Sequence, residues 1–400
     1  MTFASLNHLA ESGLHANMLA GCRGKPATNK HRMNKELSSF AARLRGLIAN
    51  PRSVISHPHY CELALELFAL QFKHNPAYRK ICEARRLSPE IVTHWTQIPA
   101  VPTGAFKELE LTSIPPAERT AVFHSSGTTG QNPSRHFHSP ESLSVYEASL
   151  WTWFEQNLYS NSKLICLTPP PAQAPQSSLV HMFETVRQHF DGGAGVLAGR
   201  REFLGKLDSD GAWILDFAAT LEVLFPRTPR PAPHALLLLG TAFSFVHLLD
   251  YLVERDLRVE LPPGSRVMET GGYKNRSRVL PKAELHTLIT ERLGVPRENI
   301  ICEYGMSELS SQAYDTPRPA PGAPRLFCFP PWARVQIISP ETGHEVAEGE
   351  TGLIRIFDLA NVFSVAAIQT EDLGVRRGDG FELIGRAQLA EPRGCSLMTA

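Results

Sequence analysis

The sequence predicts an α/β protein of layered sheets and helices, with a small β subdomain toward its C-terminal end. Between residues 235 and 303 short apolar strands alternate with helices, which is the pattern of an α/β layered sheet. From about residue 331 the segments become extended, with a tight turn at 341–343, as in antiparallel strands. A loop of hydroxyl residues and glycine at 125–130 follows a strand-like segment at 120–123. Ligand groups gather at strand ends in such folds, so we expect the binding site there.

The length and charge of the chain restrict its partners. Forty basic and forty acidic residues cancel among 400, without a strongly basic segment. This balance disfavours nucleic acid or an anionic membrane as the main partner and favours a small molecule or a protein. No apolar run reaches the length of a membrane span, and no signal-peptide core is evident, so we expect a cytoplasmic location.

Periodicity and turn residues predict the elements in order. Helices are expected at 36–48, 61–73, 140–158 and 178–190, in a segment ending at 253, and at 281–293. Strands are expected at 120–123, 163–168, 235–239, 266–269, 300–303, 334–338 and 352–357. Prolines within 95–107 disfavour a regular helix and predict an extended path toward the 125–130 loop. The chain is thus divided into a poorly ordered extension (1–34), an α/β core (35–330), a β subdomain of the same core (331–386) and a tail (387–400).

The seven cysteines show no metal-site or disulfide pattern. They lack CxxC spacing and a companion His pair, which disfavours both a disulfide framework and a structural zinc site. We therefore expect free thiols.

The loop at 125–130 is suited to hold phosphate. Glycine lets the backbone approach an anion, and hydroxyls add donors. The loop consists of Ser125, Ser126, Gly127, Thr128, Thr129 and Gly130. An ordinary surface turn has a similar composition, so the other motifs must decide. A P-loop NTPase is disfavoured because no GK[ST] ending follows Gly130.

Four motifs together resemble the adenylate-forming superfamily, which includes acyl-CoA synthetases and luciferases. They are the 125–130 loop, 304–308 (YGMSE), 370–374 (TEDLG) and 385–386 (GR), in matching order and approximate spacing. Within that superfamily, the segments 62–70, 98–107 and 391–397 resemble the LuxE-type acyl-protein synthetase branch. The implied fold is that of the superfamily's N-terminal domain, and its usual C-terminal mobile domain is expected to be absent.

The resemblance implies roles for individual residues, with ATP and Mg²⁺ as cofactors. Glu308 matches the position that holds Mg²⁺, a role suited to a hard oxygen ligand, although an isolated Glu is more often a solvated carboxylate. Asp372 matches the acid that accepts hydrogen bonds from ribose hydroxyls, and Arg386 the basic residue near the nucleotide.

Further matches surround the nucleotide and the acid substrate. An adenine-binding slot needs glycine, which allows close approach of the backbone, and an aromatic ring for stacking. The residues assigned to the nucleotide are Gly271, Gly272, Tyr304, Gly305 and Ser307, with Tyr273 less specific. His181 lies where relatives line the acyl pocket, and a core histidine is an equal alternative. Large apolar residues that could line this pocket, or simply fill a core, are Trp151, Trp153, Met182, Phe183 and Phe243.

The sequence departs from the superfamily pattern in two respects. The usual loop lysine is missing, and Arg135 is a possible replacement. Without the mobile domain another group must take the acyl chain, and the resemblance assigns this to Cys395. Nine residues separate it from Arg386 and could span roughly 30 Å. The neighbouring Arg393 favours the thiolate, although a free thiol on a frayed tail is the ordinary alternative.

The sequence therefore predicts an ATP-dependent acid:protein ligase. It would activate a carboxylic, fatty-type acid as acyl-AMP and transfer the acyl group to Cys395 as a thioester. By analogy with the bioluminescence relatives, a partner such as an acyl reductase would receive it. Two alternatives remain: a ligase for coenzyme A or an acyl-carrier protein, and a non-catalytic nucleotide-binding subunit of a reductase complex.

Overall fold

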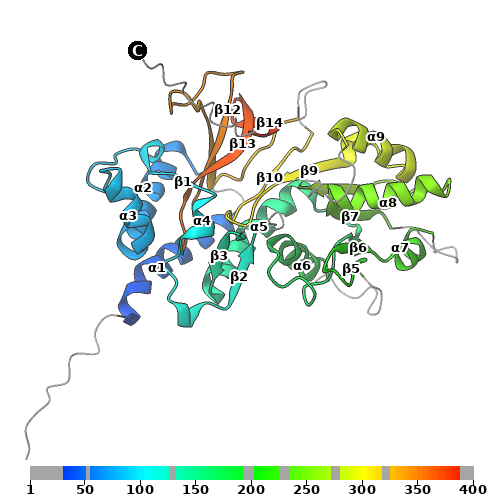
Figure 1. The fold of residues 1–400 in the computed structure, drawn as a ribbon, viewed down its shortest axis with the longest axis horizontal. Helices are drawn as coiled ribbons and strands as arrows, with labels where there is room; N and C mark the ends of the chain where they lie inside the picture. Colours follow the sequence, from blue (N-terminus) through cyan, green and yellow to red (C-terminus); the bar gives the residue numbers. More distant parts are fainter. Residues whose placement is uncertain are drawn as a thin grey trace, which may run out of the picture.

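The structure, a computed structural model, describes residues 30–50, 55–125, 132–191, 202–225, 234–271, 280–317 and 325–387. Two five-stranded sheets and the helices that cover them form most of this part (Figure 1). One sheet is largely parallel and the other largely antiparallel. The predicted α/β class with layered sheets is confirmed.

The parallel sheet has the strand order β10-β9-β8-β7-β4. Its members are β4 (Lys163–Cys166), β7 (Leu236–Thr241), β8 (Arg266–Thr270), β9 (Ile300–Tyr304) and the antiparallel edge strand β10 (Ala313–Tyr314). The four parallel strands agree with the predicted positions within about two residues. Their continuous apolar sequences suit strands that are buried on both faces.

Helices cover both faces of this sheet. On one face α8 (Ala242–Glu254) and α9 (Lys282–Leu293) pack with Val267 and Ile300. On the other, α5 (Pro140–Leu158) and α6 (Ser178–Asp191) pack with Met268 and Ile301. Because successive strand residues point to opposite faces, each strand contributes to both cores.

The second sheet contains the strands nearest the C-terminal end. β11 (Ala333–Ile338), β12 (Thr351–Asp358), β13 (Ala367–Arg377) and β14 (Gly380–Arg386) are antiparallel neighbours in chain order. The predicted strands 334–338 and 352–357 correspond to β11 and β12. The prediction included β13 and β14 only as motifs.

This sheet shares its core with the first helices of the chain. α1 (Lys30–Ile48), α2 (His57–His74) and α3 (Pro76–Ala84) belong to the same hydrophobic cluster as its strands. The buried Gln71 donates from Nε2 to the carbonyl of Asn361 and accepts from the amide of Ala366. The predicted β subdomain at 331–386 is therefore joined to residues of the chain's first hundred.

The proline-containing segment differs from its predicted path. It forms η1 (Trp95–Gln97), β1 (Val101–Pro102) and the short helix α4 (Ala105–Glu108). β1 pairs in parallel with β13, with Val101 opposite Ile368. The segment is therefore an edge strand and one helical turn, since proline is tolerated where no donor to the ladder is needed.

Smaller elements were not predicted. They are η2 (Pro116–Glu118), the hairpin of β5 (Gly205–Leu207) and β6 (Trp213–Leu215), α7 (Phe217–Leu224) and η3 (Arg297–Asn299). Residues 30–34, assigned to a poorly ordered extension, form the start of α1, because a nucleated helix extends over neighbours that lack apolar periodicity. The rest of that extension lies outside the described residues.

Candidate active site

The first component of the site is the carboxyl end of the parallel sheet. Thr270 ends β8 and lies opposite Glu303 of β9. Gly271 follows with φ 71°, a left-handed conformation that favours glycine. Gly305 follows Tyr304, and a Cβ there would lie 2.3 Å from the Glu303 Oε1 atom. The predicted nucleotide residues Gly271, Tyr304 and Gly305 thus lie at the carboxyl end of the parallel sheet, where ligands of open α/β sheets bind.

The second component is the hairpin that carries the phosphate-binding loop. β2 (Ala121–His124) and β3 (Arg135–His138) are antiparallel, and the loop joins them. At its base the amide of Ser125 donates to the carbonyl of Ser134 at 3.3 Å, and the amide of Ser134 donates to Ser125 Oγ at 2.9 Å. Residues 126–130 of the predicted loop lie outside the described residues, so only its closed base is placed.

The loop base contacts the 304–308 motif. Ser134 Oγ lies 3.4 Å from Ser307 Oγ. His136 Nδ1 donates to the Ser307 carbonyl at 2.6 Å, and it must carry the proton because a carbonyl only accepts. Burial lowers the pKa of His136 to about 4, so the ring is neutral at pH 7. The sequence predicted no role for His136, because no local pattern marks a histidine that makes such a contact.

Glu308, the predicted metal ligand, lies next to this contact. It is 5% exposed, and its Oε2 atom accepts a hydrogen bond from Ser307 Oγ at 2.9 Å. The Asn361 amide donates to the Glu308 carbonyl and so holds the backbone from the side of the antiparallel sheet. One buried carboxylate beside a phosphate-type loop fits Mg²⁺, which takes one or two carboxylates and completes its coordination with phosphate oxygens and water.

Asp372 and Arg386 meet Tyr304 between the two sheets. The Tyr304 hydroxyl donates to Asp372 Oδ2 at 2.9 Å. Asp372 lies opposite Arg386 on β13 and β14, and its Oδ1 atom is 3.6 Å from Arg386 Nε. Burial raises the pKa of Asp372, while the Tyr304 hydroxyl and the Arg386 charge counteract this. The Arg386 side chain is 78% exposed, so it can turn toward a bound anion.

His181 belongs to an aromatic cluster beside the hairpin. Its ring lies 5.2 Å from Phe123 of β2 and 5.8 Å from Tyr146 of α5, and its Nε2 atom is 3.0 Å from Glu147 Oε1. The buried His138 ring contacts the same Phe123, and its Nε2 atom has no hydrogen-bond partner among the described residues. A buried polar atom without a partner marks a place for water or a ligand.

The remaining predicted side chains have other surroundings. Met182 and Phe183 of α6 are buried in the core that this helix forms with α5 and the parallel sheet, and Trp151 stacks on His189. Trp153 donates to a backbone carbonyl, and Phe243 contacts His247. Arg135 lies 3.8 Å from Glu110. Gly272, Tyr273 and Cys395 lie outside the described residues.

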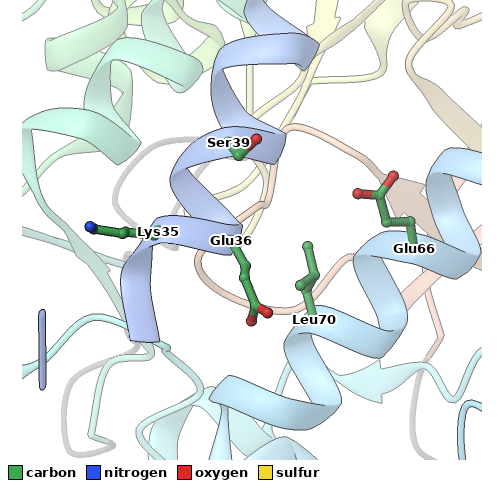
Figure 2. A pocket seen from close by; sticks show the side chains of 5 residues that line it. All are labelled: Lys35, Glu36, Ser39, Glu66 and Leu70. Atoms are coloured by element: carbon green, nitrogen blue, oxygen red, sulfur yellow. The ribbon is translucent and has the colours of Figure 1, made fainter. Parts of the chain in front are cut away.

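A surface cavity between α1 and α2 is separate from these motifs (Figure 2). Its volume is about 390 Å³, and it is lined by Lys35, Glu36, Ser39, Glu66 and Leu70. Its carboxylates already have partners, since Glu36 pairs with Lys73 and His74, and Glu66 pairs with Arg43. No predicted site residue lines this cavity, and we do not assign the substrate to it.

Comparison with solved structures identifies the fold. A 2-hydroxyisobutyryl-CoA ligase in the postadenylation state, in complex with 2-HIB-AMP, matches 82% of this chain and 67% of its own, with 13% identity and a TM-score of 0.58. The same enzyme in the thioesterification state matches 84% and 69%, with 14% identity and a TM-score of 0.57. The fold is thus that of an adenylate-forming enzyme.

Comparison of sequences supports the resemblance to one family. The model of the acyl-protein synthetase family LuxE matches residues 208–400. A long-chain-fatty-acid–luciferin-component ligase of Aliivibrio fischeri is 26% identical over 358 residues, which is 85% of this chain and 87% of that protein. Its Vibrio harveyi counterpart is 21% identical over 82% and 84%. The chain thus resembles the LuxE-type acyl-protein synthetases, as the motifs predicted, and the family and relatives that it matches indicate a ligase.

Two structural expectations concern cysteines and membranes. No disulfide joins the cysteines of the described ranges. In the same ranges no helix combines the length and apolar character that a membrane span requires.

Proposed function

We propose that this chain is an ATP-dependent acid:protein ligase that activates a fatty-type carboxylic acid and loads it on its own Cys395. The observation that carries the proposal is the contact of the loop base with Ser307 and Glu308, beside the Tyr304–Asp372–Arg386 group. The base of the predicted phosphate loop and the 304–308 motif thus lie at the carboxyl end of the parallel sheet, and Asp372 and Arg386 approach Tyr304 from the antiparallel sheet. The names of the relatives supply the acid class, since both are long-chain-fatty-acid ligases.

In the first step a carboxylate oxygen attacks the α-phosphorus of ATP, and pyrophosphate leaves. The 125–130 loop would donate to the phosphates, with its base held by Ser125 and Ser134. Glu308 would hold Mg²⁺, which when bound neutralises triphosphate charge. Asp372 would accept from the ribose hydroxyls and exchange its present donor, Tyr304, for them. The aromatic cluster with His181 would lie toward the acid.

In the second step the thiolate of Cys395 attacks the acyl carbonyl carbon, and AMP leaves with the bonding electron pair. The product is a thioester, from which the acyl group would pass to a partner such as an acyl reductase. Both the cysteine acceptor and this partner rest on the family resemblance, and the relatives' names, which refer to a luciferin component, agree with an acyl-consuming partner.

Acid-dependent ATP–pyrophosphate exchange across a panel of carboxylic acids tests the first step. We expect exchange with long-chain acids and a loss of about 100-fold in Glu308→Gln, because a preorganised charge partner of the phosphates is removed. Glu298→Gln, an exposed carboxylate in η3, is the matched control and should exchange normally. Nucleotide binding without acid-dependent exchange would instead identify a non-catalytic subunit.

Intact-mass analysis tests the second step. Wild type and Cys61→Ser should carry one acyl adduct after incubation with ATP and acid, whereas Cys395→Ser should retain exchange and lose the adduct. If Cys395→Ser forms product normally, or if the acyl group appears only on coenzyme A or a carrier protein, the self-acylation step is wrong and the chain is an ordinary acid–thiol ligase.

A further inference from the structure

Three buried side chains that the proposed reaction does not use converge near the carboxyl ends of β8 and β9. Glu269 of β8 and Cys302 of β9 lie opposite each other in the strand register, and His286 approaches them from α9. The Cys302 thiol donates to Glu269 Oε1 at 2.8 Å, His286 Nε2 lies 3.4 Å from the same oxygen, and Sγ lies 3.6 Å from Nε2. All three residues are less than 8% exposed.

The spacing of these atoms approaches that of a tetrahedral metal site. Zinc bonds of about 2.0–2.3 Å place neighbouring ligand atoms roughly 3.4–3.6 Å apart. The two distances that involve His286 are within this range. Only the sulfur–oxygen separation is shorter, and it would open by roughly 0.7 Å once the thiol proton between the two atoms is lost.

The charges also suit a divalent cation. A carboxylate, a thiolate, a neutral imidazole and a 2+ ion add up to zero, so a metal would neutralise the buried group completely. Thiolate and imidazole are ligands that zinc prefers, whereas Mg²⁺ prefers oxygen. We propose that Glu269 Oε1, His286 Nε2 and Cys302 Sγ form a buried site for a zinc-type divalent cation, with water in the fourth position.

Binding releases the Cys302 proton to solvent as the sulfur–metal bond forms, and no electron is transferred. Burial raises the pKa of the Cys302 thiol well above its usual value, so affinity should increase with pH. Lys282 interacts with the thiol and also donates to Asp315 at 2.7 Å, and its side chain is 49% exposed. Because the Lys282 side chain is half exposed, its ammonium group can turn toward solvent as an ion enters.

The position of the cluster predicts that a bound metal would stabilise the ends of β8 and β9. Glu269 immediately precedes Thr270 and Gly271, and Cys302 is two residues before Tyr304. A metal shared by β8, β9 and α9 would hold the two strand ends that carry the nucleotide residues. It would thus stabilise the fold without contacting the substrate.

The test uses the full chain, stripped with a chelator and titrated with Zn²⁺, and with Co²⁺ as a spectroscopic probe. We expect one ion per chain, a thiolate-to-cobalt charge-transfer band, release of one proton and an increase in Tm. Cys302→Ser and His286→Gln should each weaken binding by more than the roughly 10–100-fold that loss of an outer-shell partner costs. Exchange activity of the proposed reaction is measured separately and does not enter this test.

Cys166→Ser is the matched control, because this buried cysteine on β4 lies outside the cluster. It should keep the band and the stoichiometry. The proposal is overturned if wild type gives no thiolate–cobalt band, or if Cys302→Ser and His286→Gln bind the ion as wild type does. The latter result would assign the ion to other ligands. If Cys302→Ser does not fold, His286→Gln and Glu269→Gln decide between these outcomes.

Discussion

The two faces of strands β8 and β9 carry acids in different surroundings. On the face toward α9, Glu269 meets the thiol of Cys302 and the ring of His286. On the opposite face, Glu303 accepts a hydrogen bond from Thr270 and interacts electrostatically with Tyr146 of α5. The first acid has a thiol and an imidazole beside it, whereas the hydrogen-bond donor to the second is a hydroxyl group. A shift of one residue along a strand therefore changes the chemistry that an acid can perform.

The largest expected effect concerns the face with Glu303. Burial raises the pKa of Glu303 from 4.5 to about 7. The folded state thus binds the proton more tightly than the unfolded chain, and this contribution to stability, complete below pH 4.5, is lost as pH rises through 7. The variant Glu303→Gln lacks this contribution. Its unfolding free energy minus that of wild type should therefore increase by about 3 kcal/mol between pH 4.5 and 8.

Urea unfolding at several pH values measures this difference. The comparison with wild type is needed because burial also raises the pKa of Asp358, to about 6, and Asp358 therefore adds a pH dependence in the same direction. Glu298→Gln, at an exposed position, should follow wild type throughout. A constant difference between Glu303→Gln and wild type across this pH range would show that Glu303 is not protonated in the folded protein.

A smaller effect is expected on the opposite face. Cys302→Ala removes both buried side-chain volume and the donor to Glu269, while Cys166→Ala removes the same volume from β4 without that donor. In the presence of a chelator, Cys302→Ala should be the more destabilised by about 1–2 kcal/mol. Thermal and urea unfolding measure the difference. Equal losses would mean that the thiol–carboxylate hydrogen bond contributes nothing to stability.

The smallest effect is expected at the end of β9, where the Tyr304 side chain contacts Asp372 of the antiparallel sheet. Tyr304→Phe removes the donor to Asp372 and should cost about 0.5–1.5 kcal/mol of stability. Because that hydrogen bond favours the ionised carboxylate, its loss should raise the pKa of Asp372 and move the acidic limb of pyrophosphate exchange to higher pH. Tyr159→Phe, with an exposed ring, is the control. An unchanged pH profile would separate Asp372 from the reaction.

Regular elements with strong periodicity were predicted well. The parallel strands and helices α5, α6, α8 and α9 lie within about three residues of their expected bounds. β13 and β14 were missed as strands because glycine and acidic residues at 371–374 and 378–380 lower β-propensity, while pairing with β12 and β1 overrides it. Of the candidate site, Tyr304, Asp372 and Arg386 were predicted together and lie together. His136 was missed because nothing local distinguishes a buried histidine that supports a motif from one that fills a core.

Local pattern in the chain determines which segments become strands and helices, and the order of its motifs indicates the family that it resembles. These features depend on neighbours a few residues apart. The contact of His136 with Ser307, 171 residues apart, and the convergence of Glu269, His286 and Cys302 depend instead on strand order, register and helix packing. The scattered cysteines showed no zinc-type spacing, because a site built from two strands and a helix needs none. Only the folded sheet, with alternate residues on opposite faces, decides which side chains meet.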